Sequence, residues 1–274
     1  MIASRPRELL LAAAIDGALL AAFLFSACAF AVLLFHPAMP ATSAIPASLV
    51  RRGLMGVAMG LTAMALVYSP LGRRSGAHLN PAVTLTFALL RKVRVDAAVA
   101  YVVMQVVGAL VGVAAAYVVF PDRLAHASVR FVATEPGPSH VVAWWAEFLL
   151  SFVLLFAVLA VASSRRWSVY AGAVAGALVA LFIAVEAPLS GMSLNPARSL
   201  GSAAFAGSWE SLWIYLTAPT GGMALVAVVR RGLCQAHGRG EGCAKLCHLE
   251  GDRCVFCEKA ESDADGSHPT SRHA

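Results

Sequence analysis

Two copies of the tripeptide Asn-Pro-Ala, at residues 80–82 and 195–197, constrain the fold of this chain most. Asparagine is a good helix cap, and proline suits the first helical position because its missing N–H would be unpaired there anyway. Each copy therefore predicts the start of a helix. The apolar stretches that follow, residues 82–90 and 197–205, cover roughly half of the ~20 residues that a helix needs to cross a bilayer. We expect two half-helices.

The composition is typical of a polytopic membrane protein. Of the 274 residues, 59% are hydrophobic and only 13% are charged, and the mean hydropathy is +0.74. These values exclude an ordinary soluble domain. Six apolar stretches are candidates for membrane spans, and they are residues 9–35, 53–69, 97–120, 141–163, 169–187 and 211–229. The first stretch is too long for a cleavable signal peptide and is followed by further spans.

The cations in the predicted loops set the orientation. If the N-terminus is cytoplasmic, eleven Arg and Lys residues lie on inside loops and flanks, and four lie outside, namely Arg51, Arg52, Arg123 and Arg130. The positive-inside rule then places both termini in the cytoplasm. We expect an integral, multi-pass protein of a bacterial inner (plasma) membrane. The same loop bias explains the formal charge of +6, so no nucleic-acid partner is expected.

The chain divides into two inverted repeats and a tail. Each repeat, at about residues 8–120 and 140–229, holds three spans with a half-helix after the second span, and this odd number of crossings inverts the second repeat. Paired broken segments in inverted repeats predict a site near the bilayer midplane. The membrane domain is predicted at residues 1–229, with an external connection at residues 121–139. The tail, residues 230–274, is rich in Cys and His, and its end is expected to be disordered.

Two facing half-helix starts have a defined chemistry. Their unpaired N–H groups and dipoles contribute about half a positive charge each, which disfavours cations. Each cap oxygen can hold its own helix and leave the amide NH2 of Asn80 and of Asn195 free to donate to a water, which then cannot easily relay a proton. Backbone carbonyls upstream are expected to form a ladder of acceptors, contributed by Gly76, Ala77, His78, Gly191, Met192 and Ser193. This pattern suits a line of small neutral hydroxylated molecules.

The chain resembles the aquaporin, or major intrinsic protein, family over about residues 8–230. The motifs that carry the resemblance are Ser75-Gly-Ala-His-Leu-Asn80-Pro81-Ala82-Val-Thr, Ser193-Leu-Asn195-Pro196-Ala197-Arg198-Ser-Leu-Gly, Tyr101-Val-Val-Met-Gln105-Val-Val-Gly108, and Trp213-Ile-Tyr215 with Pro219 and Gly222. The resemblance implies an all-α membrane protein with six transmembrane helices and two half-helices in a right-handed, inverted-repeat bundle. It also implies one pore per subunit and normally four subunits together.

The resemblance further implies a selectivity filter. Arg198 lies three residues after Asn195, and the family places this arginine in the narrowest part of the pore, where it donates to the permeant and repels cations. Ungapped spacing from the two asparagines gives the other filter positions as Gly60, Ile183 and Met192. Gly60 in place of a ring would widen the constriction, and Ile183 removes a donor. The pattern is closer to nodulin-like channels, which conduct metalloid acids and small polyols, than to strict water channels.

Three acids lie within predicted spans. Asp16 and Glu147 occupy corresponding places in the two repeats, and the family assigns such a glutamate to supporting the loops that carry the half-helices. The alternative is a proton relay, which would make the protein a proton-coupled small-solute transporter. Glu186, three residues beyond Ile183, either pairs with Arg198 or faces the outer vestibule.

Five of the six cysteines lie in the tail, whereas Cys28 lies in the first span and is expected to be a small buried hydrophobe. In a reducing compartment such clustering favours a metal over disulfides. Four thiolates suffice for a tetrahedral zinc site, and they would come from Cys243, Cys247, Cys254 and Cys257. Unliganded thiols are the alternative.

The sequence therefore predicts a passive channel that needs no cofactor for transport. Its expected permeants are water and small uncharged solutes such as glycerol, urea or metalloid hydroxides, while protons and ions are excluded. An enzyme is disfavoured because the sequence contains neither a nucleophile–base set nor a membrane-embedded cluster of metal ligands. The expected partners are the permeants, the lipid bilayer and identical subunits in a homotetramer.

Overall fold

The computed structural model describes residues 6–164 and 166–236. Within these residues six helices are long and apolar enough to cross a membrane, and they are α1 (Pro6–Phe35), α3 (Ser48–Tyr68), α6 (Val95–Val119), α8 (His140–Ala162), α9 (Ala171–Ser190) and α11 (Leu212–Ala236). They correspond to the six predicted spans. Helix α11 continues past residue 229 to Ala236, so the first residues assigned to the tail belong to this helix. The four candidate zinc ligands lie outside the described residues.

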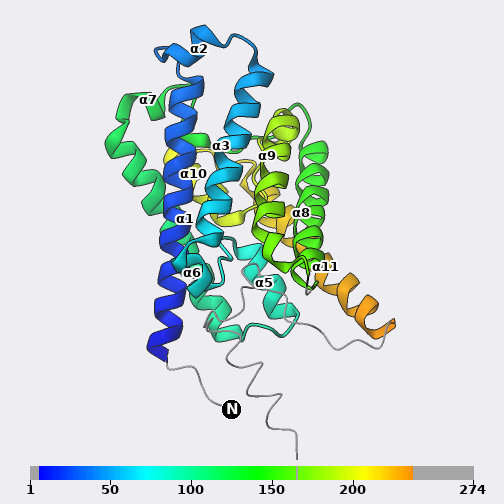
Figure 1. Cartoon of the computed structure of the whole chain (residues 1–274). Coiled ribbons are helices and arrows are strands. Elements are labelled where there is room, and N and C mark those ends of the chain that lie inside the picture. Colours follow the sequence, from blue (N-terminus) through cyan, green and yellow to red (C-terminus); the bar gives the residue numbers. More distant parts are fainter. Residues whose placement is uncertain (1–5, 165, 237–274) are drawn as a thin grey trace, which may run out of the picture.

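Two short helices begin at the Asn-Pro-Ala copies. Helix α5 runs over Pro81–Leu89 and α10 over Pro196–Ala206, each with proline in its first turn. Figure 1 shows α5 in the lower part of the bundle and α10 in the upper part. Helix α10 packs against α6, and α5 packs against α11, so each half-helix contacts the last span of the other repeat. The two repeats are therefore interlocked.

Short helical segments occupy the connections, and they are α2 (Pro40–Ala44), α4 (Pro70–Ser75), α7 (Pro121–Ala125), η1 (Arg130–Val132) and η2 (Ser168–Tyr170). Helix α4 matters for the site because it lies between α3 and the first half-helix, and it was not predicted from the sequence. Its start has a clear local cause. The Ser69 hydroxyl accepts a hydrogen bond from the Gly72 N–H at 2.9 Å, and Pro70 is the first helical residue.

Glycines set the closest crossing of α3 and α9, which belong to different repeats. A Cβ atom on Gly60 would clash with the carbonyl oxygen of Gly176, and a Cβ atom on Gly176 would clash with that of Gly60. One turn away, Gly56 lies equally close to the carbonyl oxygen of Ala180. Small residues permit this approach in a bilayer, where helix association depends on packing rather than on the hydrophobic effect.

The same arrangement joins the first and third spans of each repeat. Gly108 on α6 lies against the carbonyl oxygen of Gly17 on α1, and Gly222 on α11 lies against that of Phe148 on α8. Gly17 and Phe148 each follow a buried acid, Asp16 or Glu147. The inverted repetition predicted from the sequence is therefore visible in the packing as well as in the order of the helices.

Apolar side chains remain exposed on the outer faces of the bundle. On α6, Val99, Val103, Val107 and Val111 recur at a four-residue spacing, and each is roughly half exposed. Large contiguous apolar faces are not stable in water, whereas a bilayer covers them without cost. Helix α1 begins and α11 ends at the same end of the bundle (Figure 1). The chain is an integral, multi-pass membrane protein.

The glycine crossing of α3 and α9 leads to a stability prediction. Gly60→Ala should lower the melting temperature of the purified protein, because the added Cβ forces two backbones apart, and overpacking of this kind costs about 1–3 kcal/mol. Gly53→Ala in the same helix is the matched control, since a Cβ there meets nothing within 4 Å. It should hold or raise the melting temperature, because alanine favours helices over glycine. Equal melting temperatures for the two variants in a thermal unfolding assay in detergent would contradict the crossing.

Candidate functional site

Two re-entrant loops precede the half-helices and share an unusual backbone. Positive φ angles occur at the same three positions of each loop, namely Gly76, Ala77 and Leu79 in the first and Gly191, Met192 and Leu194 in the second. Left-handed backbone is uncommon outside glycine and persists where surrounding structure imposes it. Such a backbone forms neither helix nor sheet, so its buried N–H groups need partners elsewhere in the protein.

Asp16 supplies these partners for the first loop. Its carboxylate accepts hydrogen bonds from the backbone N–H groups of His78 and Leu79, each at 2.9 Å. The Ser75 hydroxyl donates to it at 3.3 Å and the Gln105 side-chain amide at 2.7 Å. The aspartate is fully buried. The bonds from the two N–H groups fix the loop backbone, and the bonds from Ser75 and Gln105 fix the Asp16 carboxylate.

Glu147 does the same for the second loop. It accepts from the backbone N–H groups of Ser193 and Leu194, each at 2.7 Å, and from the Ser190 hydroxyl at 2.6 Å. Neither Glu147 nor Asp16 lines the cavity between the loops. The two acids therefore support the loops, and their position gives no support to a proton relay along the cavity.

Tyr101 and Tyr215 fix the beginning of each loop. The Tyr101 hydroxyl donates to the Ser75 carbonyl at 2.7 Å, and the Tyr215 hydroxyl donates to the Ser190 carbonyl at 2.6 Å. Both tyrosines are buried and lie on the third span of their repeat. Sequence reasoning assigned them no role, although their matching places in the two repeats were a usable signal.

Each asparagine caps its own half-helix. The Asn80 Oδ1 accepts from the Ala82 N–H at 2.8 Å, and the Asn195 Oδ1 accepts from the Ala197 N–H at 3.1 Å. The Arg198 N–H also donates to Asn195 Oδ1, at 3.3 Å. These bonds satisfy N–H groups that have no partner within the helix.

Each asparagine also bonds to the opposite loop. The Asn80 Nδ2 donates to the Leu194 carbonyl and the Asn195 Nδ2 donates to the Leu79 carbonyl, both at 2.7 Å. The prediction that both amide groups are free is therefore too simple, because one N–H of each amide joins the two repeats. An asparagine amide has two N–H donors, so each side chain retains one for the cavity that both line.

A cavity of about 410 Å³ passes the two asparagines. Its wall includes most of the predicted carbonyl ladder, namely Ala77, His78, Gly191, Met192 and Ser193. Gly76 does not line it. This glycine instead ends α4 in a left-handed conformation, and its N–H donates to the Gly72 carbonyl at 2.9 Å. The His78 ring stacks on Phe87, and its Nδ1 lies 3.0 Å from the Thr84 hydroxyl.

Met59 lines the cavity from α3, whereas Gly60 does not. Gly60 faces α9, where it makes the backbone crossing with Gly176. The assignment of Gly60 to the filter is therefore wrong. Counting back from Asn80 without a gap assumes a fixed loop length, and α4 lies in that interval. An error of one residue turns a helical position by about 100°. The wall carries a flexible apolar side chain where glycine would leave space.

Arg198, Ile183 and Met192 also line the cavity. The Nη1 atom of Arg198 is buried and has no hydrogen-bond partner among the described residues. A buried donor that lacks a partner is unfavourable by about 1–3 kcal/mol, and more when charged. Because Arg198 lines the cavity, its guanidinium is a candidate donor to a molecule that enters.

Glu186 takes neither of its predicted roles. It forms no ion pair with Arg198 in the described part of the chain, and it does not line the cavity. Ile183 and Ala187 on the same helix face the cavity, and Glu186 is turned about 100° from Ala187. It is buried within the bundle with 6% of its surface exposed.

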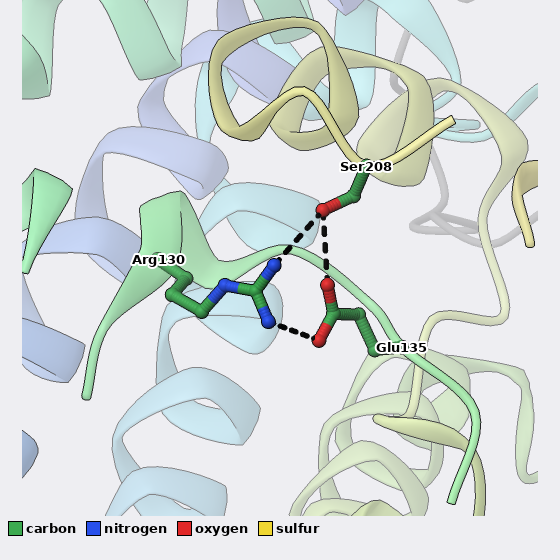
Figure 2. A network of polar contacts seen from close by, with 3 residues as sticks. All are labelled: Arg130, Glu135 and Ser208. Atoms are coloured by element: carbon green, nitrogen blue, oxygen red, sulfur yellow. Dashed lines mark hydrogen bonds and ion pairs between the residues drawn. The ribbon is translucent and has the colours of Figure 1, made fainter. Parts of the chain in front are cut away.

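The part of the inter-repeat connection that follows α7, residues 126–139, contributes to the cavity wall. Val129 and Val132 lie on the wall, and the three successive residues 130–132 all have positive φ. Figure 2 shows how this strained turn is held. The Arg130 guanidinium contacts the Glu135 carboxylate and the Ser208 hydroxyl, and Ser208 in turn donates to Glu135 at 2.9 Å. The connection is thereby tied to the end of α10.

A buried chain of hydroxyls joins the same connection to the second re-entrant loop. The Thr134 hydroxyl lies 2.6 Å from that of Ser199, which lies 2.5 Å from that of Ser193. Ser193 also donates to the Asn195 carbonyl at 3.0 Å. No periodicity or motif in the sequence indicated Thr134 as a partner of Ser199, because Thr134 lies in irregular backbone.

Two histidine rings pack at 4.8 Å between centroids, His36 after α1 and His126 after α7. Desolvation lowers the pKa of His36, and the neighbouring His126 and Arg123 lower it further. The Ala38 N–H donates to the His36 Nδ1 at 3.1 Å, which requires that nitrogen to be unprotonated.

No group of three or more His, Cys, Asp or Glu side chains in the described ranges could hold a metal.

The chain belongs to the major intrinsic protein family, whose family model matches residues 11–230. It is 40% identical over 156 residues to Aquaporin NIP1-2 of Arabidopsis thaliana, covering 55% of this chain and 53% of the relative. It is 36% identical over 150 residues to Nodulin-26 of Glycine max, covering 54% of each chain. The chain thus spans about half the length of the curated relatives it matches.

A solved structure, the aquaglyceroporin from Plasmodium falciparum, has the same fold. It superposes with a TM-score of 0.65 at 20% sequence identity, covering 82% of this chain and 98% of that chain. The predicted fold class, an all-α bundle with six membrane helices and two half-helices, is confirmed by this likeness and by the described helices.

Loop support by Glu147 can be tested without measuring transport. Glu147→Gln should lower the melting temperature in detergent, because the amide cannot accept from both loop N–H groups, and each bond to a charged group contributes about 1.5–3 kcal/mol. Glu210→Gln is the control, since Glu210 is exposed. If the Glu147 variant has the same melting temperature as the control and the wild type, the carboxylate does not hold the loop.

Proposed function

We propose that this chain forms a passive channel for water and small uncharged solutes. The observation that carries the proposal is the cavity that passes between two capped half-helix starts, each cap keeping one amide N–H for a permeant. Donors at the centre and loop carbonyls beyond them match the donors and acceptors of water and of alcohols. Family membership supports the same function.

The filter that we infer consists of Met59, Ile183, Met192 and Arg198, all on the cavity wall. One strong donor faces three apolar side chains, and two of these are flexible thioethers. Such a wall suits small molecules with both hydroxyl groups and apolar surface. Glycerol, urea and metalloid hydroxides are the solutes that we propose besides water.

Protons and other cations are excluded for electrostatic reasons. Both half-helix N-termini direct positive partial charge toward the centre, and Arg198 adds a full charge to the wall. Neither Asp16 nor Glu147 lines the cavity, so a cation inside it would contact neither carboxylate directly. We infer a channel rather than a proton-coupled transporter, and a transport protein rather than an enzyme.

We propose further that the protein acts as a homotetramer in a bacterial inner membrane with both termini in the cytoplasm. The exposed valine face of α6 is available for contact between subunits, and the loop cations support the orientation of the termini.

We also propose a zinc site at Cys243, Cys247, Cys254 and Cys257, on sequence spacing alone. The zinc content of the purified protein should fall in a variant with Cys243→Ser and Cys257→Ser, and equal content in both would refute the site.

Osmotic shrinkage of reconstituted vesicles tests the channel. By stopped-flow light scattering, vesicles with the protein should shrink faster than empty vesicles, and an imposed proton gradient should not change the rate. Shrinkage no faster than that of empty vesicles would overturn the proposal. A rate that follows the proton gradient would favour the coupled transporter.

The assignment of Met59 is tested by solute selectivity. Met59→Ala should raise glycerol flux relative to water flux, because it removes a long side chain from the cavity wall. Met64→Ala is the matched control on the same helix, since Met64 does not line the cavity. An unchanged ratio in the Met59 variant, or an equal change in both, would show that Met59 does not limit the passage.

A further inference from the structure

Methionines are frequent on the cavity wall. Of the seven methionines in the described residues, four line the cavity, namely Met55, Met59, Met192 and Met223. Their relative exposure is 8% or less. These thioethers are therefore screened from bulk solvent, and a reagent reaches them through the cavity. That route admits only a small neutral molecule, because the half-helix dipoles and Arg198 oppose cations.

Two of these methionines share the cavity wall with Arg198. Met59 belongs to the same buried cluster as Ala197, the residue before Arg198. Met192 packs with Leu194 and Ile183. Together with Arg198, both side chains belong to the filter that we infer.

The Arg198 guanidinium has an unpartnered donor in the described part of the chain, so oxidation of a methionine sulfur in the filter would supply it with an acceptor. Arg198 Nη1 is buried and has no partner among the residues that the structure describes. A thioether sulfur is only a weak acceptor, so neither Met59 nor Met192 can satisfy this donor well. A sulfoxide is polar and carries an oxygen that accepts hydrogen bonds well.

We propose that Met59 and Met192 are oxidation sites at which hydrogen peroxide closes the pore. A sulfur lone pair attacks one peroxide oxygen, and the O–O bond breaks. That oxygen stays on sulfur as the sulfoxide, and the second leaves as water after taking up the proton of the first. Sulfur is oxidised by two electrons and the peroxide is reduced by two. The new oxygen accepts from Arg198, and the pair blocks the filter.

The test uses the full chain in vesicles and rests on the proposed function. Untreated vesicles must first shrink faster than empty ones, so failure of the channel is recognised before any oxidant is added. Vesicles are then exposed to hydrogen peroxide, and mass spectrometry locates sulfoxides. We expect oxidation at Met59 or Met192 and a several-fold loss of water permeability. The bulkier tert-butyl hydroperoxide should oxidise Met39, which is partly exposed in the α1–α3 connection, and spare the filter.

Two variants separate closure of the filter from general damage. A variant with Met59→Leu and Met192→Leu keeps the volume but removes the sulfur, and its flux, compared with its own untreated sample, should survive peroxide. Met104→Leu, away from the cavity wall, should lose flux as the wild type does. The proposal is overturned if neither filter methionine is oxidised, if oxidation leaves wild-type flux unchanged, or if the double variant loses flux equally.

Discussion

Two buried carboxylates hold backbone that could not otherwise exist inside a membrane. Asp16 and Glu147 each accept two loop N–H groups and one serine hydroxyl. Without water, an unpaired N–H at this depth is very unfavourable, so the re-entrant loops depend on these acids. Once the loops are fixed, their asparagines meet and bond across the repeat boundary. The cavity, its donors and its filter all follow from that meeting.

Much of this architecture is predictable from local chemistry. Helix caps act over two or three residues, so the Asn-Pro-Ala copies predicted the starts of α5 and α10 directly. Apolar stretches of membrane length predicted the six spans for an equally local reason, because each span must satisfy its own backbone. Comparison of the two repeats showed that Asp16 and Glu147 recur at the same place, whereas their support of the loops was expected from the family resemblance, with a proton relay as the alternative.

Features that depend on register or on irregular backbone were not predictable. Met59 rather than Gly60 lines the cavity, and an ungapped count back from Asn80 could not show this because α4 lies within the counted interval. Thr134 comes from a connection that has no periodicity, and its hydroxyl chain to Ser199 depends on three-dimensional proximity alone. The bond from each asparagine amide to the opposite loop was not predictable for the same reason, because it also depends on three-dimensional proximity. A cap can be predicted from sequence, but the partner across a repeat boundary cannot.

We propose that a path marked by the two asparagine amides and the loop carbonyls crosses the bilayer between the two half-helices. The temperature dependence of osmotic water flux in reconstituted vesicles tests whether water follows this path. Water that moves through a preformed path breaks few hydrogen bonds with its surroundings, so we expect a shallow temperature dependence, close to that of diffusion in bulk water. A steep dependence, equal to that of empty lipid vesicles, would show that water does not cross through such a path.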